Sequence, residues 1–150
     1  MIKRSVAAIA ASLLCAALVS SACDANQVQK VKNASARIER ATGAVIQLLP
    51  AFRDEGLFDT GEEAKIAEGL NGVKLALSQF NQRAASYKTF DATAKVDLSK
   101  ALADVTAALA VLNEQGVLHI KNPKVKGRVQ MAFVAANLAA QEIADALNQE

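Results

Sequence analysis

The sequence predicts an all-α protein, an up-down-up-down four-helix bundle that follows an N-terminal signal peptide. Three observations lead to this fold class. Alanine, the strongest helix former, supplies 25 of the 128 residues from Cys23 onward, and the whole chain has only two prolines. Apolar residues recur every three or four positions along four segments, and short polar stretches separate these segments. We therefore expect a signal peptide over residues 1–22 and one bundle domain over residues 23–150.

The first segment of the bundle predicts a helix over about residues 25–49. Pro50 is expected to end this helix, because proline lacks the backbone N–H that the next turn needs. The face expected to point inward carries Val28, Val31, Ser35, Ile38, Thr42, Val45, Leu49 and Phe52, with Ala34, Ala41 and Leu48 beside them.

The second segment predicts a helix over about residues 61–87. Thr60 and Glu63 have the spacing of a capping box, in which each side chain bonds a free backbone N–H of the first turn. Gly69 and Gly72 either allow a neighbouring helix to approach closely or only weaken the helix. The inward face is expected to carry Ile66, Leu70, Val73, Leu77, Phe80, Ala84 and Tyr87.

The third and fourth helices are predicted over about residues 92–114 and 123–148. Gly116 is expected to end the third helix in the left-handed conformation, and Asn122 with Pro123 is expected to begin the fourth. The inward residues of the third helix are Leu98, Ala101, Leu102, Val105, Leu109 and Leu112. Those of the fourth helix are Val125, Val129, Ala132, Phe133, Ala136, Ala140, Ile143 and Leu147.

The N-terminal segment has the layout of a secretory signal peptide. Lys3 and Arg4 precede 18 uncharged residues from Ser5 to Ala22, and small residues close the stretch. An uncleaved membrane anchor is the alternative, because 18 apolar residues are about the minimum that can span a bilayer.

The segment Val19-Ser20-Ser21-Ala22-Cys23 resembles the lipobox of bacterial lipoproteins, although Ser20 stands where leucine is usual. This resemblance implies that Cys23 is acylated and becomes the first residue. An ordinary signal-peptidase cut after Ala22 would leave the same start, but it would also leave one thiol without a disulfide partner, because Cys15 would be removed. In enterobacterial lipoproteins an aspartate after the cysteine is associated with inner-membrane retention, so Asp24 is a sorting hint. The expected location is a membrane surface facing the periplasm or the cell exterior, reached through the lipid anchor.

Charge and residue inventory exclude several functions. Without residues 1–22 the chain carries fifteen basic and fifteen acidic residues, which argues against nucleic-acid binding. The single histidine, His119, cannot build a di-iron or zinc site, and there is no glycine-rich phosphate loop or nucleophile elbow. We therefore expect no metal, no cofactor and no enzyme activity. Met131 is expected to be an ordinary packing residue.

The first and third connections should meet at the end of the bundle opposite the anchor. We call the residues gathered there the tip: Leu57, Phe58, Leu118, His119, Lys121, Lys124, Lys126 and Arg128. In one interpretation the apolar residues close the end of the core and the cations are solvated. In the other, the tip binds a partner through an apolar patch with a charged rim. The function expected is a structural or protein-interaction role, with an envelope protein or a second copy as partner. The alternative is a carrier of a small apolar ligand or lipid within the bundle.

Overall fold

The computed structural model describes residues 3–149, with side chains from Ala25 onward apart from that of Thr60. Four helices make up most of this part of the chain, and no strand occurs in it, so the predicted all-α bundle is confirmed. The helices are α1 (Lys3–Asp54), α2 (Thr60–Ser86), α3 (Ala92–Val111) and α4 (Pro123–Asn148). A π-helical turn, η1 (Leu112–Gly116), and a 3-10 turn, η2 (Val117–His119), join α3 to α4.

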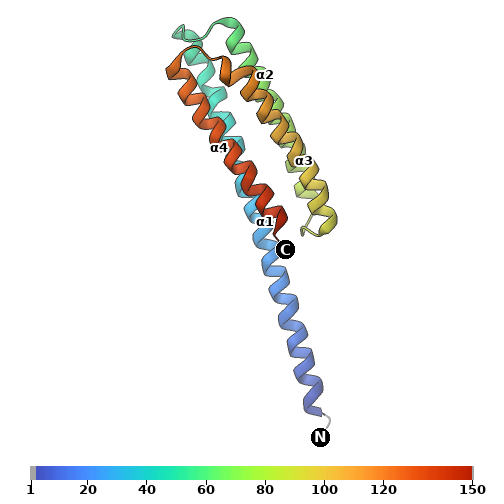
Figure 1. Cartoon of the computed structure of the whole chain (residues 1–150). Helices are drawn as coiled ribbons and strands as arrows, with labels where there is room; N and C mark the ends of the chain where they lie inside the picture. Colours follow the sequence, from blue (N-terminus) through green and yellow to red (C-terminus); the bar gives the residue numbers. More distant parts are fainter. Residues whose placement is uncertain (1–2, 150) are drawn as a thin grey trace.

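The four helices form a ring in chain order. α1 packs against α2 and α4, and α3 packs against the same two helices from the other side. Figure 1 shows successive helices running in opposite directions, with the connections α1–α2 and α3–α4 together at one end. The N-terminal part of α1 continues past the other three helices at the opposite end (Figure 1). The topology is therefore up-down-up-down, with the start of α1 outside the bundle.

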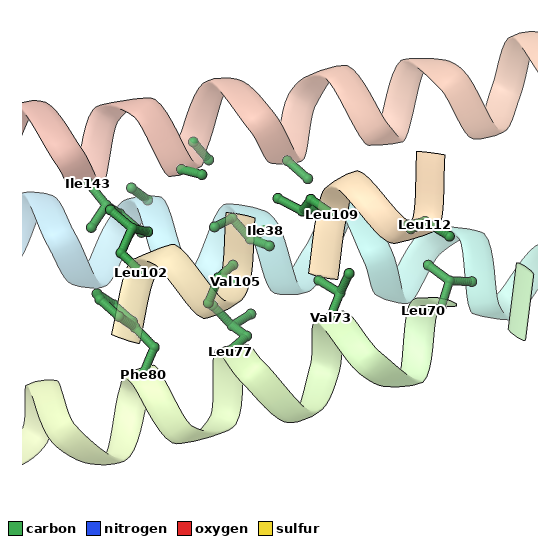
Figure 2. Packing of buried hydrophobic residues seen from close by; sticks show 14 of the residues in the cluster. Ile38, Leu70, Val73, Leu77, Phe80, Leu102, Val105, Leu109, Leu112 and Ile143 are labelled. Carbon is green, nitrogen blue, oxygen red and sulfur yellow. The ribbon is translucent and has the colours of Figure 1, made fainter. Parts of the chain in front are cut away.

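The four predicted apolar faces make the core. Figure 2 shows how side chains from all four helices meet, with Phe80, Leu102 and Ile143 toward one end and Leu70 and Leu112 toward the other. Nearly all of the residues expected inside are buried, including Ser35 and Thr42 on α1. The six that remain half-buried at the margin are Val28, Ala41, Leu48, Tyr87, Ala132 and Phe133. Helical spacing alone identified these faces because each helix touches the core along one narrow strip.

The end of α1 differs from the prediction, because the helix continues through Pro50 to Asp54. The extra turn buries Phe52, whose side chain is 5% exposed, and this burial offsets the hydrogen bond lost at the proline. Gly56, at φ +66°, then stops the helix. The N–H of Leu57 donates to the carbonyl of Phe52 and that of Gly56 to the carbonyl of Arg53, the two bonds of a Schellman motif.

The prediction for Gly116 was also wrong. Its φ is −108°, so it is not a left-handed terminator, and α3 passes through η1 and η2 before the chain turns. Gly116 is buried against α2, where an added Cβ would lie 3.3 Å from the Cγ1 atom of Ile66. The glycine is therefore explained by the lack of space beside α2.

The first turns of α2 and α4 are held by side-chain caps. The predicted capping box is displaced by one residue, because Asp59 and Glu62 form it in place of Thr60 and Glu63. The N–H of Glu62 donates to Asp59 at 2.8 Å, and the N–H of Asp59 donates to Glu62 at 3.0 Å. Asn122 caps α4 ahead of Pro123, as predicted.

Candidate functional site

The structure brings together the two connections from which the tip was predicted. Leu57 and Phe58 are half-buried, and the Phe58 ring meets that of Phe52 edge-on at 5.6 Å between centroids. In the third connection, Val117 and Ile120 are buried. Leu118 is 56% exposed and His119 is also exposed. The apolar residues of the tip thus divide into a plug that closes the core and one leucine that faces solvent.

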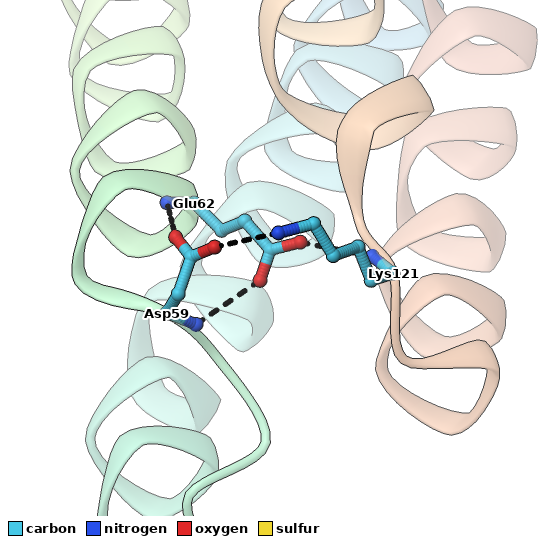
Figure 3. A network of polar contacts seen from close by, with 3 residues as sticks. All are labelled: Asp59, Glu62 and Lys121. Atoms are coloured by element: carbon cyan, nitrogen blue, oxygen red, sulfur yellow. Dashed lines mark hydrogen bonds and ion pairs between the residues drawn. The ribbon is translucent and has the colours of Figure 1, made fainter.

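Lys121 joins the two connections through the capping box (Figure 3). Its Nζ atom donates to Asp59 at 2.9 Å, and its backbone N–H donates to Glu62 at 3.0 Å. The hydrogen bond from Lys121 and the one from the backbone N–H of Glu62 lower the pKa of Asp59, and the same contact with Asp59 raises the pKa of Lys121. Both side chains are more than half exposed, so the pair aligns the loops more than it stabilises them.

Two further cations of the tip also bond within the chain. Lys126 Nζ donates to the carbonyl of Leu118 at 3.4 Å, and the Arg128 guanidinium lies 6.0 Å from the centroid of the Phe52 ring. Lys124 is exposed, and its side chain makes no ion pair with any described residue. Leu118, His119 and Lys124 are therefore the tip residues most available to a partner.

The middle of the bundle is closely filled. The interior hollow between the four helices measures about 10 Å³, and its lining includes Thr42, Val45, Leu70 and Phe133. This hollow has space for at most about one water molecule, whereas small-molecule pockets have volumes of roughly 300–1,000 Å³. The interior gives no support to the alternative of a ligand carrier.

One helix of the described chain is long and apolar enough to cross a membrane. It is the continuous stretch Ala92–His119. Leu98, Val105 and Leu109 on this stretch are fully buried between the other helices. The core thus accounts for part of its apolar character, while Val96 and Val111 on the same stretch are exposed.

Cys23 and Asp24 lie within the backbone of α1, and their side chains fall outside the described part of the structure. Among the described residues, no three His, Cys, Asp or Glu side chains are grouped closely enough to hold a metal ion.

Sequence reasoning missed one feature of α4. Met131 was expected to pack in the core but is 69% exposed, and Val134 and Leu138 on the same face are 48% and 52% exposed. The signal was present in the sequence, because these residues repeat at three- and four-residue spacing on the side opposite Val129 and Ala136.

The chain was also compared with known proteins. No protein-family model matches it, and no match is found among curated proteins or among solved structures.

Proposed function

We propose that this chain is a lipid-anchored helical bundle of the bacterial cell envelope, with a structural or protein-interaction role. The observation that carries this proposal is the position of the N-terminal segment. The stretch that ends at Cys23 belongs to the part of α1 that extends beyond the other helices (Figure 1). Every described core residue lies between Val31 and Leu147. Cleavage before Cys23 would therefore leave the core of the bundle complete.

An acylated Cys23 would attach the bundle to a membrane without embedding it. Two or three acyl chains meet the requirement of two membrane signals for stable anchoring. The tip, at the other end of the bundle, would then face away from that membrane.

The anchor is tested by intact mass and membrane fractionation of the protein from its native host, wild type beside Cys23→Ser. We expect a wild-type mass of the chain from Cys23 plus acyl groups in the membrane fraction, and an unprocessed or released variant. A mass from Cys23 without lipid would indicate a secreted bundle with a free thiol. A mass from Met1 would indicate an uncleaved anchor. Either result would overturn the lipoprotein proposal.

The interaction role is tested at the tip. Leu118→Asp changes the exposed leucine of the tip, and Leu75→Asp, at a 62% exposed leucine on α2, is the matched control. We expect Leu118→Asp to lose a protein that co-purifies with the tagged wild type from native membranes, while Leu75→Asp retains it. Identical sets of co-purifying proteins for all three chains would contradict the tip as the binding surface.

A further inference from the structure

The outer face of α4 carries a row of exposed apolar side chains. We call Met131, Val134 and Leu138, which are 69%, 48% and 52% exposed, the α4 stripe. Other exposed large apolar residues, such as Leu75 on α2 and Val96 on α3, lie on different helices. Scattered single residues of this kind are normal on protein surfaces, but a row along one helix face indicates a contact surface.

The α4 stripe is the middle of a longer heptad pattern. Exposed residues follow one another at spacings of three and four in the order Lys124, Gly127, Met131, Val134, Leu138, Gln141 and Asp145. This is the spacing of the contact positions of a two-helix coiled coil, and the apolar residues that such a contact needs occupy the three central positions. The inner face of α4 already packs in the bundle, so the pattern on the outer face provides a second seam.

The charges of α4 are divided between its two ends. Lys124, Lys126 and Arg128 lie in the first two turns, Glu142 and Asp145 lie near the end, and residues 129–141 carry no charge. Both groups oppose the dipole of their own helix, which favours acids at the start and bases at the end. The dipole of α4 therefore does not explain this arrangement.

We propose that the α4 stripe binds a second copy of this chain, with the two α4 helices antiparallel. The pattern runs from Lys124 to Asp145, so its midpoint lies between Val134 and Ala135. Antiparallel pairing about this midpoint sets the basic start of each helix against the acidic end of the other. It also sets the two helix dipoles in opposite directions, whereas parallel pairing would bring like charges together.

Lys124 and Asp145 are the charges best placed for this contact. Glu142 already bonds Arg37 of its own chain, and Arg128 lies over the Phe52 ring. Neither Lys124 nor Asp145 has an ion-pair partner among the residues that the structure describes. In the antiparallel pair Lys124 of one copy faces Asp145 of the other, near each end of the apolar row.

The geometry sets a condition for copies that carry a lipid anchor. Because the bundles point in opposite directions, the two N-terminal ends leave the dimer on opposite sides. Two copies in the same membrane face the same way and cannot pair in this manner. If the proposed anchor is present, the contact joins copies on facing membranes. The pairing itself does not depend on the anchor.

The first test is the mass of the full chain in detergent, measured by analytical ultracentrifugation from micromolar to millimolar protein. We expect a concentration-dependent dimer for the wild type and for the control Leu75→Glu. Leu138→Glu should weaken this dimer by about tenfold or more, the effect of removing a central apolar contact. Helix content by circular dichroism shows whether each variant is folded. A monomeric wild type, or equal dimerisation by Leu138→Glu and Leu75→Glu, would overturn the proposal.

The second test is charge exchange, which reports the direction of pairing. Lys124→Glu and Asp145→Lys should each weaken the dimer, because each sets like charges against each other. The double variant Lys124→Glu/Asp145→Lys should restore it, because the exchanged charges again face opposite ones. Failure of the double variant to recover would overturn the antiparallel arrangement. Both tests use purified protein alone, so they succeed or fail independently of a partner at the tip.

Discussion

The two ends of the bundle reach close packing by different means. At the tip end, glycines let helices approach closely: an added Cβ at Gly69 would lie 2.8 Å from the Cδ1 atom of Leu112. At the other end, which we call the base, large side chains such as Phe80 and Ile143 are buried together with alanines such as Ala140. The close approach at Gly69 makes the tip end sensitive to added volume, and the full burial of Phe80 makes the base sensitive to lost volume, although one core joins the two ends.

The polar contacts of the two ends differ in the same way. The tip connections are joined by a compact network of Asp59, Glu62 and Lys121. At the base, side chains reach the backbone and side chain of Gln149: Gln27 Nε2 of α1 donates to the Gln149 carbonyl at 2.9 Å, and Lys30 Nζ of α1 donates to the Gln149 side chain at 3.1 Å. Lys95 Nζ of α3 also donates to the Gln149 carbonyl. The Oε1 atom of Gln27 is buried and has no partner among the described residues. The buried polar atom without a hydrogen-bond partner thus lies at the base and not at the tip.

The largest effect is expected from removing volume near the base. Phe80→Ala should lower the free energy of unfolding by about 3–5 kcal/mol, because it leaves a cavity where a fully buried ring was. Urea denaturation measures the change, with Leu75→Ala as a control expected to stay within about 0.5 kcal/mol. If Phe80→Ala lowers the free energy of unfolding no more than Leu75→Ala does, the base is loosely packed.

The next largest effect is expected from adding volume at the tip end. Gly69→Ala should destabilise the bundle by about 1–2 kcal/mol. The overlap of the new methyl group with Leu112 should cost more free energy than the higher helix propensity of alanine contributes. Gly72→Ala is the matched control on the same helix. No atom outside its own helix backbone and chain neighbours lies within 4 Å of that added Cβ, so this variant should gain roughly 0.5–1 kcal/mol. Equal signs for the two substitutions would contradict close packing at Gly69.

A smaller effect is expected from the polar network of the tip. Asp59→Asn keeps a good N-cap residue but removes the charge that Lys121 contacts. The pKa of Asp59 lies below its ordinary value of 3.8, so the carboxylate stabilises the fold above that pH and loses this effect as the pH falls through its folded pKa. Thermal melts should therefore show a lower Tm for the variant at neutral pH and a shrinking difference in acid. A difference independent of pH would assign the effect to the cap alone.

The smallest effect is expected at a surface contact near the base. The Tyr87 hydroxyl donates to Asp97 at 3.1 Å, and this bond raises the pKa of Tyr87 above 10.0. The protonated tyrosine thus stabilises the fold below that pH, and the contribution is lost as the pH rises through the folded pKa. In alkaline thermal melts the wild type should lose its small advantage over Tyr87→Phe. An advantage that persists above the folded pKa would exclude this hydrogen bond as its source.

Helical periodicity predicted the interior of this protein better than its boundaries. The buried faces follow from local spacing, because a helix repeats its contacts every turn. The ends depend on what the next residues meet: α1 passes Pro50 because Phe52 has a buried position beyond it, and Gly116 lies where α2 leaves no space. Neither fact is contained in the local sequence.

The sequence predicted where the tip lies, but not which of its side chains are free of contacts within the chain. Topology and spacing brought the two connections together, whereas the contacts of Lys121, Lys126 and Arg128 within the chain depend on side-chain directions. Met131 shows the opposite failure. Its exposure could have been read from its position opposite the buried face of α4, but methionine is so common in cores that residue type outweighed spacing.

Because α1 is continuous, it would set the distance between the membrane and the far end of the bundle. α1 is one helix from Lys3 to Asp54 and so includes the proposed attachment point at Cys23. At a rise of 1.5 Å per residue, the path from residue 23 to residue 54 is about 47 Å long. A chain acylated at Cys23 would hold its far end at a set height above the lipid surface, as a rod and not as a tether. Adding or deleting one residue before Val31 would change that height by about 1.5 Å and turn the bundle by about 100°.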